Sequence, residues 1–286
     1  MVQEALREVA FNNAQRYFKR EGDYLQDGLL YCGVCHEPRQ YRVKGLPFVP
    51  FIDCACDRAA KEKEERDRRA AQLAWTVREN TERCFQNLRQ RSFTFANDDG
   101  GNPALTRLAQ NYCRHFDEFR RSDSVQGLLL FGPPGEGKSY MACAVCNELL
   151  QRGLRCKVTG FPEIVNDLFC REDKNAYIRD LCDNDLLVLD DFGAQRDTGY
   201  MNELVFNVVN SLLLARTPVI VTTNLTNEEL KNPADMAMRR VTSRLFEMCC
   251  PHRVGGEGDG VDRRKQGLKK EYARLREVLG QGGTKP

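Results

Sequence analysis

Residues 127–142 read GLLLFGPPGEGKSYMA, which is a short apolar run, a turn rich in glycine and proline, and the start of a helix-like segment. Within this stretch, residues 132–139 fit the pattern G-x-x-x-x-G-K-[ST] of a phosphate-binding loop. Glycines let successive backbone N–H groups turn toward one phosphate chain, and the dipole of the following helix favours negative charge at its start. The stretch therefore predicts a nucleotide site between a buried strand and a helix. An ordinary turn at this place is the competing interpretation.

The loop and the residue after it supply most of the candidate nucleotide-binding residues. Lys138 is expected to neutralise the β- and γ-phosphate oxygens, and the hydroxyl of Ser139 is expected to bind Mg²⁺. The candidates from this stretch are Gly132, Pro133, Pro134, Gly135, Glu136, Gly137, Lys138, Ser139 and Tyr140.

Two carboxylates follow a second apolar run, LLVL at residues 186–189. Asp190 is expected to complete the Mg²⁺ shell, and Asp191 to polarise the water that attacks the γ-phosphate. Another strand-like run, VIVTT at residues 219–223, is followed by Asn224, whose amide could orient the same water. The alternative for the acidic pair is a helix cap or a turn, and for Asn224 an ordinary turn residue.

Strand-like runs alternate with helix-length segments from residue 127 onward. The runs lie at residues 127–131, 155–159, 186–190 and 218–223. This alternation is typical of a parallel sheet covered by helices, so the sequence predicts an α/β fold.

The composition excludes several classes of protein. Lys and Arg number 43 against 41 Asp and Glu, so with a net charge of +2 any contact with nucleic acid must be local. No apolar run approaches the roughly 20 residues of a membrane-spanning helix, so we expect no membrane partner, and the start of the chain shows no secretory leader. The 13 cysteines are an odd number in a chain of 286 residues, which disfavours a disulfide framework and indicates a cytoplasmic protein.

Four of the cysteines form two closely spaced pairs. Cys32-x-x-Cys35 and Cys54-x-Cys56 could give four thiolates to one tetrahedral Zn²⁺ and close a structural site. His36 is a competing ligand, and free buried cysteines are the alternative to a metal site. A module of this size would need such a metal to fold by itself.

The composition also divides the chain. Residues 1–56 are expected to hold a short N-terminal helix and the zinc-binding module. Residues 57–95 carry charges of both signs without glycine or proline, and they predict a solvated helical linker. Residues 96–103 read ANDDGGNP, which is a turn-forming stretch, so the nucleotide-binding domain is expected to cover residues 96–286.

Several segments together resemble the DnaC/DnaI/IstB family of AAA+ ATPases, which includes phage and bacterial helicase loaders. The resemblance covers nearly the whole chain and implies an AAA+ P-loop fold, preceded by the small zinc-binding module and the helical linker. It rests on residues 127–142 and on DLLVLDDFGAQRDT (185–198), with support from PVIVTTNL (218–225), RRVTSRLFE (239–247), GVDRR (260–264), CGVC (32–35) and CAC (54–56).

The resemblance also implies roles for single residues. Asn224 matches the sensor-1 position, and Arg264 matches a later arginine that could be a sensor-2 residue. Arg244 matches an arginine that reaches the nucleotide of the neighbouring subunit, with Arg240 one helical turn earlier. A trans-acting arginine implies a homo-oligomer, because it has no use in a monomer. Arginines that only decorate a helix surface are the alternative.

The family implies an ATP-dependent helicase loader of DNA replication, with ATP/ADP, Mg²⁺ and Zn²⁺ as cofactors. Such a protein grips a hexameric DnaB-type replicative helicase and delivers it to single-stranded DNA, with ATP binding and hydrolysis as the switch. Basic candidates for the DNA contact are Arg171, Lys174 and Arg179, whereas the basic residues 263–286 fit a docked helix better. The alternatives are a transposition helper ATPase of the IstB kind and a nucleotide-gated helicase adaptor with little hydrolysis.

Overall fold

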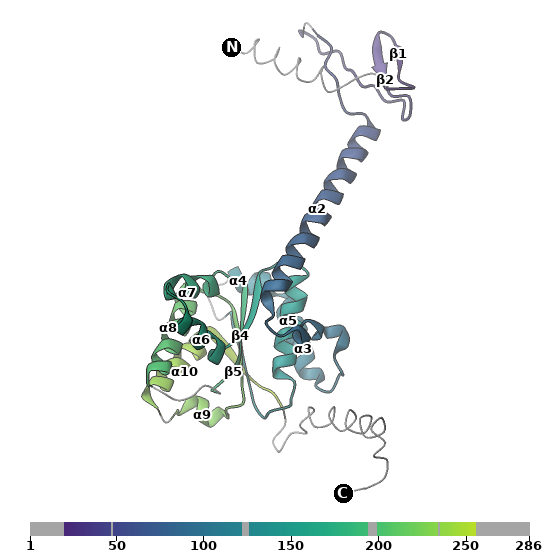
Figure 1. Cartoon of the computed structure of the whole chain (residues 1–286). Coiled ribbons are helices and arrows are strands. Elements are labelled where there is room, and N and C mark those ends of the chain that lie inside the picture. The colour runs from purple at the N-terminus through teal and green to yellow at the C-terminus, as the bar shows by residue number, and fades with distance from the viewer. Residues whose placement is uncertain (1–19, 47, 122–125, 194–198, 234, 256–286) are drawn as a thin grey trace, which may run out of the picture. The chain divides into compact units, whose positions relative to one another are not determined.

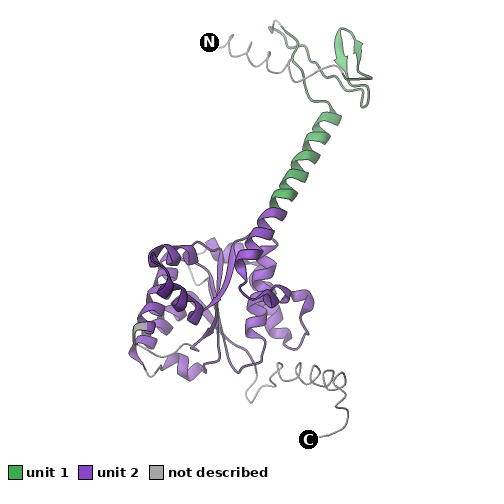
Figure 2. Cartoon of the chain, in the orientation of Figure 1, with its two compact units in different colours: residues 1–73 green, residues 74–286 purple. Residues whose placement is uncertain are grey.

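The computed structural model describes residues 20–46, 48–121, 126–193, 199–233 and 235–255 (Figure 1). The chain divides into two compact units, residues 1–73 and residues 74–286 (Figure 2). Within the described ranges, no helix is both long enough and apolar enough to cross a membrane. The N-terminal helix expected before the cysteines lies outside the described residues.

The first unit contains a two-stranded hairpin. Strands β1 (Tyr24–Gln26) and β2 (Leu29–Tyr31) pair antiparallel on either side of Asp27 and Gly28. Both turn residues have positive φ, 50° and 72°, which is the conformation that an Asp-Gly pair adopts in a two-residue hairpin turn. The hairpin leads directly into Cys32, so it fixes where the first cysteine pair begins.

A buried guanidinium connects the two ends of this unit. Arg39 is 1% exposed and pairs with Asp23 and with Asp57, whose Oδ2 lies 3.6 Å from Nη2. Arg20 reaches the other oxygen of Asp57 at 2.6 Å. Among the described residues of this unit, the buried hydrophobic side chains are Leu30 and two of the cysteines. The described interior of this unit therefore consists of charge pairs and thiols more than of apolar side chains.

Helix α2 (Ala55–Cys84) carries the charge-rich segment. Pairs of opposite charge four residues apart, such as Glu65 with Arg69 and Glu79 with Arg83, lie on its exposed surface and favour the helix. The helix was expected over residues 57–95, but it ends at Cys84.

The early end of α2 has a tertiary cause. Cys84 and Phe85 are buried, and Phe85 forms a parallel bridge with Val158 of the sheet. The chain therefore leaves the helix to enter the core of the second unit. It continues as two short 3-10 helices, η1 (Leu88–Ser92) and η2 (Phe95–Asn97).

A parallel sheet forms the centre of the second unit. In the described residues it has five strands, in the order β4-β5-β6-β3-β7. The α/β fold predicted from the sequence is confirmed. The strands are β3 (Gly127–Phe131), β4 (Cys156–Gly160), β5 (Leu186–Phe192), β6 (Val219–Thr223) and β7 (Cys249–Arg253).

The sequence did not predict β7. Its residues, CCPHR, lack the apolar run of the other strands. Pro251 is tolerated because β7 lies at the edge of the sheet and pairs on one side only, with β3.

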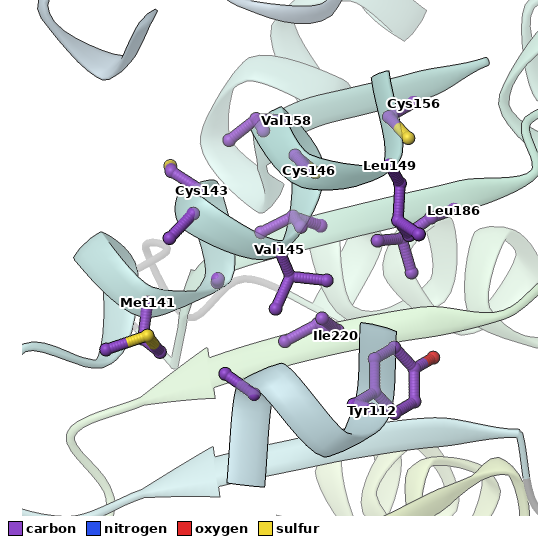
Figure 3. Packing of buried hydrophobic residues seen from close by; sticks show 14 of the residues in the cluster. Tyr112, Met141, Cys143, Val145, Cys146, Leu149, Cys156, Val158, Leu186 and Ile220 are labelled. Carbon is purple, nitrogen blue, oxygen red and sulfur yellow. The ribbon is translucent and has the colours of Figure 1, made fainter. Parts of the chain in front are cut away.

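Successive residues of the strands face opposite helical layers. Leu128 and Leu130 of β3 belong to one hydrophobic cluster, and Leu129 belongs to the other. In the first cluster, Figure 3 shows Tyr112 and Val145 near the sheet residue Ile220, and Leu149 near Leu186. The helices on this face are α3 (Pro103–Arg114), α4 (Phe116–Arg121) and α5 (Lys138–Leu150).

The second cluster covers the other face of the sheet. Its buried side chains come from strand residues such as Val219 and Val221 and from the remaining helices. These helices are α6 (Phe161–Cys170), α7 (Lys174–Cys182), α8 (Gly199–Ala215), α9 (Asn227–Lys231) and α10 (Met236–Met248). Because all strands run parallel, their carboxyl ends meet at one edge of the sheet, where the candidate site lies.

Candidate nucleotide-binding site

The phosphate loop, residues 132–139, joins β3 to α5 in the order that its motif requires. Gly132, Gly135 and Gly137 have φ values of 139°, 85° and 87°, which lie in the region that favours glycine. A Cβ on Gly132 would lie 2.2 Å from the carbonyl oxygen of Val254, so this position also has no room for a side chain. Gly137 caps α5 without a side-chain hydrogen bond, which leaves N–H groups at the helix start for an anion.

Lys138 lies inside the loop and is 5% exposed. Its Nζ donates to the carbonyl oxygens of Gly132 and Pro133, at 2.8 and 2.6 Å, and to Oδ1 of Asn224 at 2.9 Å. The ammonium is therefore held at the mouth of the loop, where a phosphate oxygen could replace these acceptors. The same contact places Asn224, directly after β6, beside the loop.

The acidic pair lies where β5 loses its regular pairing with β6. The register shifts between Leu189 and Phe192, and Asp191 has a φ of 54°, a conformation that few residues other than glycine adopt. Thr222 of β6 holds both acidic residues: its hydroxyl donates to Oδ1 of Asp190 at 2.5 Å and accepts the N–H of Asp191 at 3.0 Å.

Thr222 is a positioning residue that the sequence did not single out. It is fully buried and directly follows the apolar residues VIV (219–221) of β6. The one signal in the sequence is a hydroxyl two residues before Asn224. Its meaning depends on β5 and β6 being neighbours in register, which the sequence does not specify.

One cavity of about 570 Å³ brings eight of the predicted residues together, whereas its lining among the described residues does not include Gly132, Pro133, Pro134 and Asp190. Such a volume suits a small-molecule ligand. Tyr140 lies in its wall, where its hydroxyl donates to the carbonyl of Thr94 at 2.8 Å and its ring lies 4.9 Å from that of Phe93. The lining includes Gly135, Glu136, Gly137, Lys138, Ser139, Tyr140, Asp191 and Asn224, and across from them Asn87, Arg89, Phe93, Asn97, Asp98, Asp99, Asn102 and Leu105.

The predicted arginines lie elsewhere. Arg240 and Arg244 are both on α10, where the guanidinium of Arg240 lies 4.0 Å from the ring centre of Phe206 and Arg244 pairs with Glu247 at 2.8 Å. Neither is among the described residues that line the cavity. Arg264 lies outside the described residues.

The four predicted cysteines of the first unit do lie together. The sulfur atoms of Cys32, Cys35, Cys54 and Cys56 are all within 4.8 Å of one another. Four sulfurs bound to one zinc ion at 2.3 Å would lie about 3.8 Å apart, so small shifts would suffice to bind a metal. His36 is not part of this group, and its Nδ1 lies 3.3 Å from the hydroxyl of Tyr24.

The thiols of this group differ in acidity. Hydrogen bonds from the backbone N–H groups of Cys56 and Glu37 lower the pKa of the Cys35 thiol to about 6. Burial raises the pKa of Cys54 to about 12, and a hydrogen bond with the Cys35 sulfur raises that of Cys56 to about 11. One thiolate is thus favoured over several, because like charges at this distance repel and only a cation would stabilise all four.

Much of the chain is similar to known proteins. Residues 57–264 match the model of the family described as IstB-like ATP binding protein. The replicative helicase loader DnaC of Escherichia coli strain K12 is 28% identical over 192 residues, which are 63% of this chain and 72% of DnaC. The replicative helicase loader DnaI of Bacillus subtilis strain 168 is 25% identical over 182 residues, 57% of either chain.

Solved structures of similar proteins were also found. A crystal structure of DnaI has a TM-score of 0.49 and 19% identity, and the match covers 62% of this chain and 95% of that one. A crystal structure of the DnaC helicase loader has a TM-score of 0.48 and 22% identity, with 59% and 100% covered. The cysteine group lies before residue 57 and therefore outside the match to the family model.

Replacing Thr222 with valine keeps the shape of the side chain but removes both of its hydrogen bonds. We expect the free energy of unfolding to fall by about 1–2 kcal/mol, because the half-buried carboxylate of Asp190 and the N–H of Asp191 lose their partner. The position of the acidic pair would change as well, so ATP turnover should fall. Chemical denaturation followed by circular dichroism, together with a phosphate-release assay, measures both effects.

Thr217→Val is the matched control. Thr217 is also buried, and its hydroxyl donates to the carbonyl of Cys182 at 2.8 Å, before β6 begins. This substitution should lower the free energy of unfolding by a similar amount and leave ATP turnover per folded molecule unchanged. Equal turnover in the two variants would contradict the positioning role of Thr222.

Proposed function

Because the chain belongs to the family of IstB-like ATP binding proteins, we propose that it binds ATP with Mg²⁺ and hydrolyses it to ADP and phosphate. One observation carries this proposal, the 2.9 Å hydrogen bond between Lys138 and Asn224 in a cavity that Asp191 also lines. Groups that bind phosphate and groups that activate water therefore lie at one place.

Each polar group of the cavity has a role in this reaction. The N–H groups of the phosphate loop and Lys138 bind the polyphosphate, while Asn224 orients the attacking water and Asp191 polarises it. Ser139 and Asp190 would hold Mg²⁺, since hydroxyl and carboxylate oxygens are its preferred ligands and Thr222 fixes one oxygen of Asp190. When bound, Mg²⁺ neutralises charge on the β- and γ-phosphate oxygens.

The arginines of α10 fit a role at the nucleotide of a second copy. A guanidinium supplied in trans stabilises the charge of the transferring phosphoryl group. The side chain of Arg244 is 40% exposed. Its ion pair in the described part of the chain is with Glu247, three residues further along the same helix. Because the donor surface and the nucleotide site are different parts of the chain, such an assembly is head-to-tail. Arg264 remains a candidate contact to the nucleotide of its own chain.

We propose zinc for the cysteine group and a three-part organisation of the chain. Residues 1–56 form the zinc-binding module and residues 96–286 the ATPase domain; of the linker between them, residues 57–95, the part from Cys84 on packs with the ATPase domain. The close approach of four sulfurs supports the metal, and so does the small apolar core of this unit, because folding of so small a module needs a further source of stability.

The role that fits these parts is loading of a DnaB-type hexameric helicase onto single-stranded DNA. Support comes from the two relatives named replicative helicase loaders. The zinc-binding module would grip the helicase, and its exposed apolar side chains Leu25, Val34 and Tyr41 could contribute to that contact.

Basic residues between β4 and β5 are the candidates for the DNA contact. Arg171 is exposed and its guanidinium lies 4.6 Å from the ring centre of the buried Tyr177, so the guanidinium, and not the ring, is available to a phosphate. Lys174 begins α7, and Arg179 lies 3.8 Å from Asp173.

A transposition helper of the IstB kind is the second candidate function, since the family model carries that name. The cysteine module before the matched residues favours the loader.

Two substitutions separate nucleotide binding from hydrolysis. Lys138→Ala should abolish ATP binding, because the loop loses its one ammonium group, whereas Asp191→Asn should bind ATP and lose at least about a hundredfold in turnover. Isothermal calorimetry and steady-state phosphate release measure the two effects.

A folded wild-type protein that takes up neither ATP nor ADP would overturn the proposal. Turnover by Asp191→Asn at the wild-type rate would overturn the role of that residue, and a wild type that binds ATP but barely turns it over would be a nucleotide-gated adaptor.

Replacement of Cys32 and Cys35 by serine tests the module and the helicase contact together. The wild type should contain one Zn²⁺ per chain by elemental analysis and retain its DnaB-type helicase on an affinity column. The double variant should lose both properties while still binding ATP, because the nucleotide site belongs to the other unit.

Cys170→Ser/Cys250→Ser is the control, since both of these cysteines are exposed and lie in the second unit. It should keep the metal and the helicase. A metal-free wild-type protein with an intact fold would exclude the zinc site. Capture of a transposase with its DNA, and not of the helicase, would identify the transposition helper.

A further inference from the structure

The end of β7 lies directly against the start of the phosphate loop. In the parallel pairing of β7 with β3, Arg253 is the partner of Phe131, the residue before Gly132. The next N–H, of Val254, donates to the carbonyl of Phe131 at 2.8 Å. The missing side chain of Gly132 allows the carbonyl of Val254 to approach the loop closely. The position of Arg253 relative to the loop is therefore set by backbone contacts.

Two cavities beside the loop share Arg253. One, of about 630 Å³, is lined by Gly132, Pro133 and Asn224 together with Arg253. The other, of about 340 Å³, is lined by Glu136 and Arg253 together with residues around the start of α3. Arg253 therefore borders the loop on two sides, and one of them includes the Asn224 that binds Lys138.

The phosphate loop contains a negatively charged residue, Glu136, whose effect on a bound polyphosphate an arginine could offset. Glu136 lies in the loop and is 9% exposed. Gly255, which has a φ of +95°, packs against it, because a Cβ on Gly255 would lie 3.1 Å from the Glu136 side chain. A buried carboxylate repels a polyphosphate at this short range, since little water screens it. A guanidinium that lines the same cavity offsets that repulsion and can donate two parallel hydrogen bonds to phosphate oxygens.

We propose that Arg253 is a nucleotide-binding residue that contacts the polyphosphate of the nucleotide bound by its own chain. The inference rests on the proposed binding of ATP and adds a cation supplied in cis from the edge strand. It differs from the roles of Arg240 and Arg244, which act at the nucleotide of a neighbouring copy, and its residue belongs to none of the motifs in the sequence.

Calorimetry with full-length Arg253→Gln tests the proposal. The variant should bind ATP at least about tenfold more weakly than the wild type, because a charge-assisted hydrogen bond is lost. The loss should be smaller for ADP and smallest for AMP, since a contact to the polyphosphate acts only through the phosphates present. Arg253→Lys should recover part of the affinity, because the charge is kept and the fork of donors is not.

Arg121→Gln is the control, an exposed arginine at the end of α4 that lines neither cavity in the described part of the chain. It should bind all three nucleotides as the wild type does. Wild-type affinity in Arg253→Gln, or an equal loss for ATP and AMP, would overturn the inference. Lack of ATP binding by the wild type would instead overturn the proposed function. Should Arg253→Gln not fold, Arg253→Lys decides by the same comparison of ATP with AMP.

Discussion

The parallel pairing of β3 with β6 on one side and β7 on the other is the constraint on which the site depends. β3 carries the phosphate loop at its carboxyl end, and the pairing brings Asn224 and Arg253, at or just after the ends of their strands, to the same edge. β5 then adds the acidic pair from one strand further away. Without this register, segments far apart in the sequence would not meet at the phosphate loop, where Asp191 and Asn224 line one cavity and Asn224 and Arg253 line another.

Given this register, hydrogen bonds at the site fix the positions of single side chains. Thr222 fixes Asp190 and Asp191 through one hydroxyl, and Lys138 is fixed by two carbonyls and by Asn224. Leaving any of these buried groups without a partner costs free energy, so few arrangements of the site are accessible. The same contacts explain how Asp191 can keep a φ of 54°, because the surrounding hydrogen bonds and the pairing around it offset the local strain.

The first unit is stabilised in a different way. It has few buried apolar side chains among the described residues, and Arg39 joins two carboxylates in its interior. A buried ion pair contributes little net stability, because desolvation of the charges opposes their attraction. The four sulfurs are then the remaining source of stability, which is the physical reason to expect that this unit and a metal ion depend on each other.

The sequence by itself determined the features that depend on neighbouring residues: the glycine-rich loop, the apolar strands around it, the acidic pair after β5 and the spacing of the cysteines. Each is a local pattern, since φ preferences, strand burial and ligand spacing act over a few residues. Three features could not be predicted in this way: the end of α2 at Cys84, the edge strand formed by CCPHR, and the position of Thr222 and Arg253 beside the phosphate loop. These depend on contacts between segments distant in the chain, where a residue's role is set by its partner across the sheet and not by its neighbours in sequence.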